Sequence, residues 1–298
     1  MSKALSGLVV LRKPVGITSR DALNRLARLM PRVKMGHAGT LDPAACGVLV
    51  VCVGRATRLV PFVQRMPKEY RASMRLGQRS STHDLESAVE EMPFTGAIDR
   101  NALEHSLNKF RGEIWQVPPQ HSAVHVAGRR AYELAREGKS VELEARRVQV
   151  DRLDCTRFDY PDAELHIRCS SGTYVRSLVR DIGDDLGCGA VMTGLDRTAI
   201  GPFRLADACN AEDLDPQTVL DRLLPPRTAV PELAAIAVPE EHLADVAHGR
   251  AFIASLPGGA HSTAREFALL DRTGELLAVA ELDRSGRRLL PRVVLMDR

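Results

Sequence analysis

The chain has 298 residues, of which 44% are hydrophobic and 27% are charged, and its formal net charge is +3 at pH 7. This length suffices for one full-sized domain and a smaller second one, and the composition is that of an ordinary globular protein. The sequence shows neither a hydrophobic run of membrane-spanning length nor the hydrophobic stretch of a signal peptide, so we expect a cytoplasmic location.

The cysteines are spread along the chain without the close Cys or Cys/His spacing of a metal site, and several lie in hydrophobic runs. We therefore expect reduced cysteines, with neither a disulfide nor a zinc site. The six residues are Cys46, Cys52, Cys155, Cys169, Cys188 and Cys209.

The chain begins with a predicted strand at residues 7–12, followed by a turn at residues 13–19. Thr18 or Ser19 can cap a helix that begins near Asp21, because a hydroxyl accepts a hydrogen bond from a free backbone amide. One side of this helix is hydrophobic, with Leu23, Leu26, Leu29 and Met30. Basic residues lie on it or just after it, at Arg20, Arg25, Arg28, Arg32 and Lys34. Considered alone, this pattern favours a solvated face over a binding site.

The segment GHAGTLDP at residues 36–43 combines two glycines with an aspartate before a proline. Glycine allows backbone conformations closed to other residues, and Pro43 biases Asp42 toward an extended geometry. The hydrophobic run at residues 46–53 predicts a buried strand that supports this turn. Asp42 is therefore either an ordinary turn-capping residue or a carboxylate held out of a tight turn for chemistry.

Residues 68–77 alternate between hydrophobic and polar side chains, which is the period of a half-buried strand. Tyr70 is on the hydrophobic side, so it points either into a core or into a cleft. A polar stretch at residues 78–91 follows. The next segment predicts a helix with hydrophobic positions Ile98, Leu103, Leu107 and Phe110.

Residues 110–124 contain paired prolines and predict an extended, irregular connection. Residues 125–147 then combine a short predicted helix, near residues 132–137, with arginines whose planar side chains suit bidentate contacts to phosphate. Nearby glutamates leave a plain exposed helix as the alternative. The basic residues of this segment are Arg129, Arg130, Arg136, Lys139, Arg146 and Arg147.

An alternating strand at residues 165–169 leads to a strongly amphipathic helix, with Thr173 as its expected cap and Gly187 at its end. Arg176 lies in the first turn, where the helix dipole disfavours a cation by up to about 1 kcal/mol. Such a placement is explained either by an anionic neighbour, for which Asp42 is a candidate, or by simple exposure to solvent.

The last third of the chain predicts a second unit. Residues 194–201 begin a further strand, and a proline-rich stretch at about 220–231 is typical of a domain junction. No catalytic cluster is visible beyond it. The expected elements of this smaller, largely β unit are a short helix, a hairpin and a final strand, at residues 240–247, 267–270, 276–282 and 289–295.

Together these segments resemble the bacterial TruB family of tRNA pseudouridine synthases. Any one segment is weak evidence, whereas the set occurs in the family's order and covers most of residues 7–205. The matching segments are KPVGITS (13–19), GHAGTLDPAACGVL (36–49), KEYRASMRLG (68–77), FRGEIWQVPPQHSAV (110–124), RRAYELAREG (129–138), CSSGTYVRSLVRDIG (169–183) and TGLDRTAIGPF (193–203).

The resemblance implies isomerisation of a uridine to pseudouridine in the T loop of tRNA, at the position conventionally numbered 55, without a cofactor or a metal. It implies an α+β fold in which helices flank a mixed, mainly antiparallel sheet. The catalytic domain is expected at residues 1–230, with an RNA-binding insertion at about 120–147, and a small β-rich, PUA-like RNA-binding domain at residues 231–298. We expect a monomer that acts on the T-arm stem-loop of tRNA.

The same resemblance makes Asp42 the catalytic aspartate and pairs Arg176 with its carboxylate, which favours the charged form. Tyr70 is expected to stack on the flipped uracil and to act as base or relay for the proton that leaves C5. Asp42 either attacks ribose C1′, attacks uracil C6 or assists formation of a glycal, and these routes stay open. The RNA or uridine site is expected to include His37, Tyr70, Tyr174 and Leu195, and the RNA backbone to contact Lys13, Lys68, Arg129 and Arg130.

The sequence departs from the family's pattern in two places. Ser80, Ser81, Thr82 and Ser87 stand where a Thr-Asp-Thr-type run is common, and His125 stands where a lysine is usual, which puts loop geometry and some RNA contacts in question.

Three other functions are alternatives to this one. A catalytically silent RNA-binding protein would not require Asp42, Tyr70 and Arg176 together. A glycoside hydrolase would need a second carboxylate in a matching motif, and none is evident. A guide-RNA-dependent relative would need partner-binding extensions, which are not evident in the sequence either.

Overall fold

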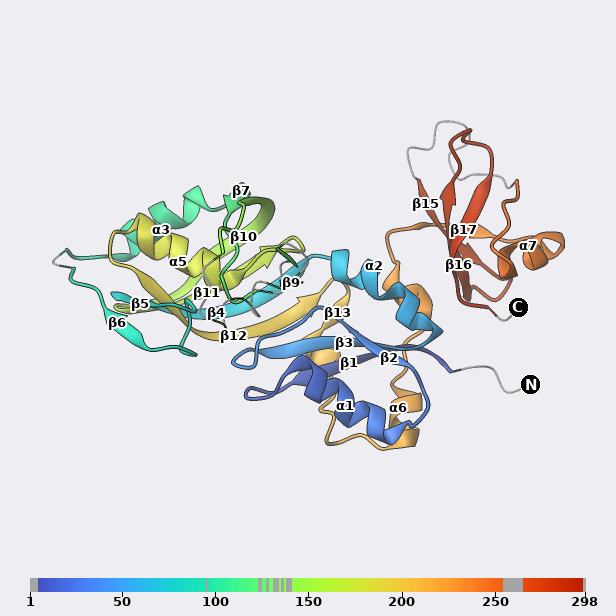
Figure 1. The fold of residues 1–298 in the computed structure, drawn as a ribbon, viewed down its shortest axis with the longest axis horizontal. Coiled ribbons are helices and arrows are strands. Elements are labelled where there is room, and N and C mark those ends of the chain that lie inside the picture. Colours follow the sequence, from blue (N-terminus) through green and yellow to red (C-terminus); the bar gives the residue numbers. More distant parts are fainter. Residues whose placement is uncertain are drawn as a thin grey trace.

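A computed structural model of the chain describes residues 5–94, 96–122, 141–253 and 265–296, together with residues 125, 126, 129, 130, 134 and 137. The main body is built on a nine-stranded sheet, and the carboxyl-terminal part forms a four-stranded sheet of its own (Figure 1). None of the helices in these ranges combines the length and the hydrophobicity that a membrane crossing requires.

The central sheet has the strand order β1-β3-β12-β4-β11-β10-β7, with β2 paired to β3 and β13 paired to β12. Its pairs are antiparallel except for β3 with β12, which run parallel. The expected mixed, mainly antiparallel sheet is therefore confirmed. The strands are β1 (Ser6–Lys13), β2 (Met35–Ala38), β3 (Cys46–Gly54), β4 (Lys68–Leu76), β7 (Gly112–Gln116), β10 (Arg146–Asp159), β11 (Asp162–Cys169), β12 (Ala190–Ile200) and β13 (Phe203–Arg204).

Two helices cover one face of the larger half of this sheet. The helices α3 (Arg100–Lys109) and α5 (Val175–Asp185) share a hydrophobic core with the inward side chains of β4, β10 and β11. Because side chains alternate along a strand, β4 buries Tyr70 and Met74 under these helices and turns Arg71 and Ser73 to the opposite, uncovered face.

Helix α1 (Ser19–Leu29) packs on the other half of the sheet, near β1 and β3 (Figure 1). Thr18 caps it: its hydroxyl accepts a 3.0 Å hydrogen bond from the Asp21 amide, and the Asp21 carboxylate accepts one from the Thr18 amide. Leu23 and Leu26 bury the hydrophobic side. The expected capping and amphipathicity of this helix are confirmed.

The expected cap of α5 is wrong. The helix begins at Val175 with Tyr174 at the capping position, and the Thr173 hydroxyl donates to the Ser170 carbonyl instead, at 3.0 Å. The reason is a tertiary contact: the Gln116 side chain accepts from the Tyr174 amide at 2.8 Å and donates to the Tyr174 carbonyl at 3.1 Å. This clamp fixes the backbone from which the helix starts.

The polar stretch after β4 is an ordered hairpin of β5 (Gln78–Ser80) and β6 (Val89–Glu91), which the sequence did not predict. A second short pair, β8 (His125–Val126) with β9 (Arg129–Arg130), lies in the insertion. The helix expected at 132–137 falls largely outside the described residues. The remaining short helices are η1 (Arg55–Leu59), α2 (Val60–Arg65), η2 (Leu205–Asp207), α6 (Pro216–Asp221), η3 (Pro226–Ala229), η4 (Glu240–His242) and α7 (Leu243–Ala247).

The carboxyl-terminal sheet has the order β14-β15-β16-β17, so a β-rich second unit is confirmed. It packs on the main body near α2, where Val279 and Leu295 share a hydrophobic cluster with Ala56 and Leu59. Arg55 adds a 3.0 Å hydrogen bond to the Leu295 carbonyl. The strands are β14 (Ala234–Ala237), β15 (Glu266–Leu270), β16 (Leu276–Leu282) and β17 (Leu289–Val294).

Gly47 offers a test of how tightly β3 meets β12. Its φ is +105°, and a β-carbon there would lie 2.3 Å from the Arg197 carbonyl oxygen. At Gly112, with φ +84°, a β-carbon would meet nothing within 4 Å. We expect Gly112→Ala to lower the free energy of unfolding by about 1–2 kcal/mol from backbone strain alone. Gly47→Ala should lose about 1–3 kcal/mol more from crowding. Urea unfolding of both variants measures this difference, and equal losses would contradict the close approach.

Candidate active site

The turn that carries Asp42 is held from one side by a buried lysine. Lys13 is fully buried, and its ammonium group donates to the carbonyls of Ile17 at 2.7 Å, Pro14 at 2.9 Å and Pro43 at 3.4 Å. Of the two glycines in the turn motif, only Gly39 has a positive φ, at +95°. The turn is therefore fixed by tertiary hydrogen bonds as well as by its own sequence.

A buried arginine supports the same turn from beneath. Arg197, on β12, is 2% exposed and donates to the carbonyls of Val48 at 2.8 Å, Gly39 at 3.0 Å and Thr40 at 3.3 Å. The sequence did not mark this residue, because it lies in an ordinary strand pattern. Its signal would have been its place in the matching segment TGLDRTAIGPF, at residues 193–203.

Arg176 connects this turn to α5. Its Nη2 lies 2.9 Å from Asp42 Oδ2, and the Arg176 side chain is 5% exposed whereas that of Asp42 is 40% exposed. The same guanidinium donates to the carbonyls of Thr82 at 3.0 Å and His121 at 2.9 Å. The carboxylate thus rests on a buried cation and keeps an open side toward solvent.

Asp84 is a second carboxylate on the same cation, and the sequence did not predict it. It is 2% exposed, and its Oδ2 lies 3.6 Å from Arg176 Nη1. Its other oxygen accepts from the Glu86 amide at 3.0 Å and from the Thr82 hydroxyl. The serines that depart from the family's pattern belong to this loop: Ser80 donates to the Asp84 carbonyl at 2.6 Å, and Ser87 accepts from the Thr82 amide at 3.2 Å.

Tyr70 lies on the face of the sheet that α3 and α5 cover, and it is 8% exposed. Burial raises the pKa of its hydroxyl to about 12, although the neighbouring Arg197 cation acts in the opposite direction. The charge of Asp42 adds slightly to the increase. The phenol is therefore protonated throughout the physiological range.

The other residues predicted for the substrate site surround this group. His37 is half-buried on β2, and burial, followed by the Arg20 and Arg197 cations, lowers its pKa. Burial raises the pKa of Tyr174, which also senses the charge of Asp42. Leu195 is a partly buried residue of β12 that packs against the core cluster containing Tyr70. The structure thus brings these residues close to the Asp42 turn.

Two of the residues assigned to the RNA backbone do not suit that role. The Lys13 ammonium group is occupied by carbonyls inside the protein, and Lys68 is 7% exposed and donates to the Gln64 carbonyl. Burial lowers the pKa of Lys68 to about 8. Arg129 forms an ion pair with Glu137, and the Arg130 side chain lies outside what the structure describes.

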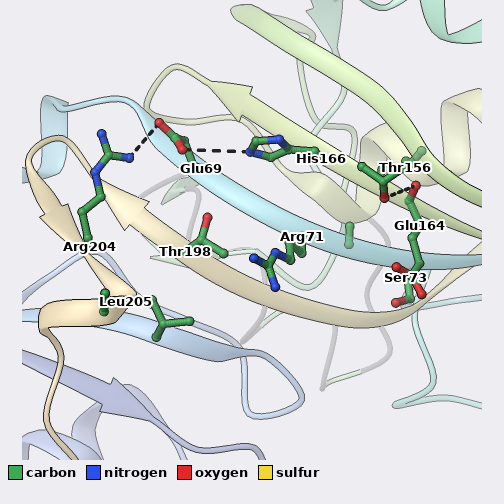
Figure 2. A pocket seen from close by; sticks show the side chains of 12 residues that line it. Glu69, Arg71, Ser73, Thr156, Glu164, His166, Thr198, Arg204 and Leu205 are labelled. Atoms are coloured by element: carbon green, nitrogen blue, oxygen red, sulfur yellow. Dashed lines mark hydrogen bonds and ion pairs between the residues drawn. The ribbon is translucent and has the colours of Figure 1, made fainter.

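A groove of about 790 Å³ lies on the uncovered face of the sheet, opposite the Asp42 site (Figure 2). Arg71 and Ser73 line it, as does Glu69, which accepts from Arg204 at 3.0 Å and lies 4.0 Å from His166. None of the site residues predicted from the sequence lines this groove. Within the described residues, no three His, Cys, Asp or Glu side chains are grouped as metal ligands would be.

Comparisons with known proteins agree on one family. Residues 27–175 match the family described as TruB family pseudouridylate synthase (N terminal domain), and residues 176–230 match the tRNA pseudouridylate synthase B C-terminal domain. A Cutibacterium acnes protein named tRNA pseudouridine synthase B is 41% identical over 292 residues, 95% of this chain and 95% of that protein. A Mycobacterium tuberculosis protein of the same name is 45% identical over 218 residues, 72% of this chain and 73% of that protein.

Among solved structures, the chain is similar to a protein in an H/ACA RNP bound to a substrate RNA containing 2′-deoxyuridine. The TM-score is 0.74 at 25% identity, and the alignment covers 98% of this chain and 86% of that chain. A chain of a Cbf5-Nop10-Gar1 complex aligns equally well, with a TM-score of 0.74, 25% identity and coverage of 98% and 85%. The expected fold class is therefore confirmed.

The buried pair of Arg176 and Asp84 should dominate local stability. Arg176→Ala leaves Asp84 buried without a counter-charge, which is expected to lower the free energy of unfolding by about 3–5 kcal/mol. Adding Asp84→Asn removes the stranded charge, so the double variant should be more stable than Arg176→Ala alone. Denaturant unfolding of the two single variants and the double variant forms the cycle, and additive losses would contradict the pairing.

The raised pKa of Tyr70 predicts a pH dependence of stability. Its folded-state value is about 12 against an unfolded value of 10.0, so the folded protein binds the proton more tightly. The resulting stabilisation is complete below pH 10 and is lost as the pH rises toward 12, at up to about 1.4 kcal/mol per pH unit. Tyr70→Phe should lack this part of the slope. Parallel urea titrations of both proteins at pH 9, 10 and 11 test it, and identical slopes would contradict the burial effect.

Proposed function

Since the chain belongs to the TruB family of pseudouridylate synthases and isomerises uridine to pseudouridine, we propose that its target is the uridine at position 55 in the T loop of tRNA. Relatives 41% and 45% identical to it are named for tRNA, which supports a tRNA substrate. The observation that carries the catalytic part of the proposal is the partly exposed Asp42 carboxylate, which rests on the buried Arg176 guanidinium at 2.9 Å.

The reaction requires a group that opens the glycosidic bond. The N1–C1′ bond breaks, the uracil turns, a C5–C1′ bond forms, C5 loses its proton and N1 gains one, so substrate and product have the same atoms. An ionised Asp42 serves three routes: attack on C1′, removal of a ribose proton to give a glycal, or attack on uracil C6. Each route needs a carboxylate that is accessible and held in place, and the open side of Asp42 together with its contact with Arg176 supports both conditions.

The target base must leave the stacked T loop before any of these steps, at a cost of a few kcal/mol. Tyr70 is proposed to stack on the flipped uracil, and Leu195 to close the pocket. Because the pKa of His37 is lowered, its ring is neutral and can occupy a space between bases without adding charge. Tyr174, clamped by Gln116, completes the wall of the pocket.

Tyr70 is proposed to relay the C5 proton instead of accepting it as a preformed base. A phenol whose pKa is about 12 has almost no ionised form near neutrality. Its hydroxyl can accept the C5 proton only while it passes its own proton on. Stacking and relay both use the neutral ring that burial favours.

Two of the competing functions, a glycoside hydrolase and a binding protein without catalysis, fit the site less well. A retaining or inverting glycoside hydrolase needs two carboxyl groups that both reach the sugar. Asp84 is 2% exposed and faces Arg176, the Thr82 hydroxyl and a backbone amide, so it cannot reach one. A binding protein without catalysis does not require a partly exposed carboxylate, because its negative charge would face the phosphates of the RNA.

The carboxyl-terminal unit from about residue 231 is proposed to be a PUA-like RNA-binding domain, and the protein to act as a monomer. The unit lies after both family matches, the second of which ends at residue 230. Its four-stranded sheet is anchored to the main body near α2, so RNA contacts made there would be fixed relative to Asp42.

The proposal is tested with unmodified tRNA and with its T-arm stem-loop, and pseudouridine is mapped by carbodiimide treatment and primer extension. Wild-type protein should modify position 55 in both RNAs. Asp42→Asn should reduce the single-turnover rate by about 10³-fold or more, because the nucleophile or base is lost.

The matched control is Asp162→Asn, which removes another carboxylate paired with an arginine, at 2.8 Å from Arg75, on the uncovered face. It should retain the wild-type rate. Modification at another position by the wild-type protein would refute the T-loop assignment, and full activity of Asp42→Asn would refute the catalytic one.

A further inference from the structure

Helix α1 starts at the Asp42 turn. Its first residue, Ser19, exchanges two hydrogen bonds with Leu41: the Leu41 amide donates to the Ser19 hydroxyl at 2.8 Å, and that hydroxyl donates to the Leu41 carbonyl at 3.1 Å. Arg20 follows directly and lies close enough to His37 to lower its pKa. The amino-terminal end of α1 is therefore part of the wall of the active site.

The outer side of α1 carries an excess of positive charge. Residues 19–34 contain five basic residues and one acidic residue. The acidic one, Asp21, is occupied by the capping box, and Arg25 forms an ion pair with Glu212. The other four, which we call the α1 stripe, are all exposed and form no ion pair with a carboxylate within the described residues; they are Arg20, Arg28, Arg32 and Lys34.

The stripe has a direction. Residues eight apart on a helix lie about 80° apart around the axis and about 12 Å apart along it, so Arg28 lies on an adjacent part of the helix surface, farther from the Asp42 turn than Arg20. Leu23 and Leu26 bury the opposite side, which keeps the arginines outward. Arg32 continues the line just beyond the helix, with a left-handed φ of +72° that few residues other than glycine adopt.

An ordinary solvated face does not account for this arrangement. Exposed arginines of the uncovered sheet face, such as Arg75 and Arg204, are paired with carboxylates at 2.8 and 3.0 Å. Arg20 also stands in the first turn of α1, where the helix dipole disfavours a cation. Arg20 thus has no carboxylate partner within the described residues, opposes the helix dipole and lies near His37. These three features suit an anionic ligand.

We propose that the α1 stripe binds consecutive phosphates of the RNA strand next to the target uridine, so that the T stem lies along α1. This inference rests on the proposed function. Arginine donates two parallel hydrogen bonds to a phosphate, and each phosphate contact releases counterions. The stripe supplies the attraction that offsets the cost of turning the uridine out of its stack.

The test uses the full chain, the T-arm stem-loop and an unmodified tRNA. Arg20→Ala/Arg28→Ala should raise KM for both RNAs by roughly 10-fold and reduce the slope of log affinity against log salt by about 1.5, with a smaller effect on kcat because Arg20 also acts on His37. Arg20→Lys/Arg28→Lys keeps the charges and should restore most of the affinity and the slope. Arg71→Ala/Arg157→Ala removes two exposed arginines from the opposite sheet face and should change neither KM nor slope.

The outcomes separate this inference from the function on which it rests. If wild-type protein modifies the T loop while the Ala variant keeps its KM and salt slope, the stripe does not bind the RNA and the inference fails alone. An increase in KM with tRNA but not with the stem-loop would also refute it, because the phosphates would then lie outside the T arm. Absence of T-loop modification by wild-type protein would refute the proposed function itself.

Discussion

The structure of the site depends on one guanidinium that is shared between two carboxylates. Arg176 lies 2.9 Å from Asp42 and 3.6 Å from Asp84, and its own side chain is 5% exposed. A buried cation requires nearby negative charge, so both acidic loops must close on α5 for the protein to be stable. The contact that stabilises α5 against the turn also fixes the position of the Asp42 carboxylate.

The turn itself is held by cations that donate to carbonyls. Lys13 donates to the Pro43 carbonyl and to two carbonyls of the preceding turn at residues 14–17, and Arg197 donates to the carbonyls of Gly39, Thr40 and Val48, so the turn is fixed without a carboxylate. Burial lowers the pKa of both side chains, because a cation loses its hydration there. The hydrogen bonds to carbonyls and the neighbouring anions offset this cost of desolvation. Rigid placement of a reacting group is what allows a small carboxylate to act on a bound base.

The two faces of the central sheet have different roles. The face under α3 and α5 is hydrophobic and directs Tyr70 toward the Asp42 site, whereas the opposite face carries paired charges such as Arg75 with Asp162 and Arg204 with Glu69. Those pairs neutralise one another, so the groove of Figure 2 offers little net charge to a ligand despite its size. Along α1, four exposed cations have no carboxylate partner within the described residues, and this excess of positive charge beside the Asp42 turn is why we place the RNA on that side.

Local patterns and motifs in the sequence sufficed to predict the main elements and the main reacting groups. Its alternation and capping signals predicted β4 and α1, because such signals are local, and its motifs named Asp42 and Arg176 as a pair through resemblance. Only the tertiary structure decided what surrounds them. Asp84 comes from a polar loop, Arg197 lies in a matching segment that gave it no role, and Lys13 and Lys68 are buried although lysines are usually exposed. These are contacts between segments far apart in the chain, and no local pattern records whether a charge will face solvent or a buried carbonyl.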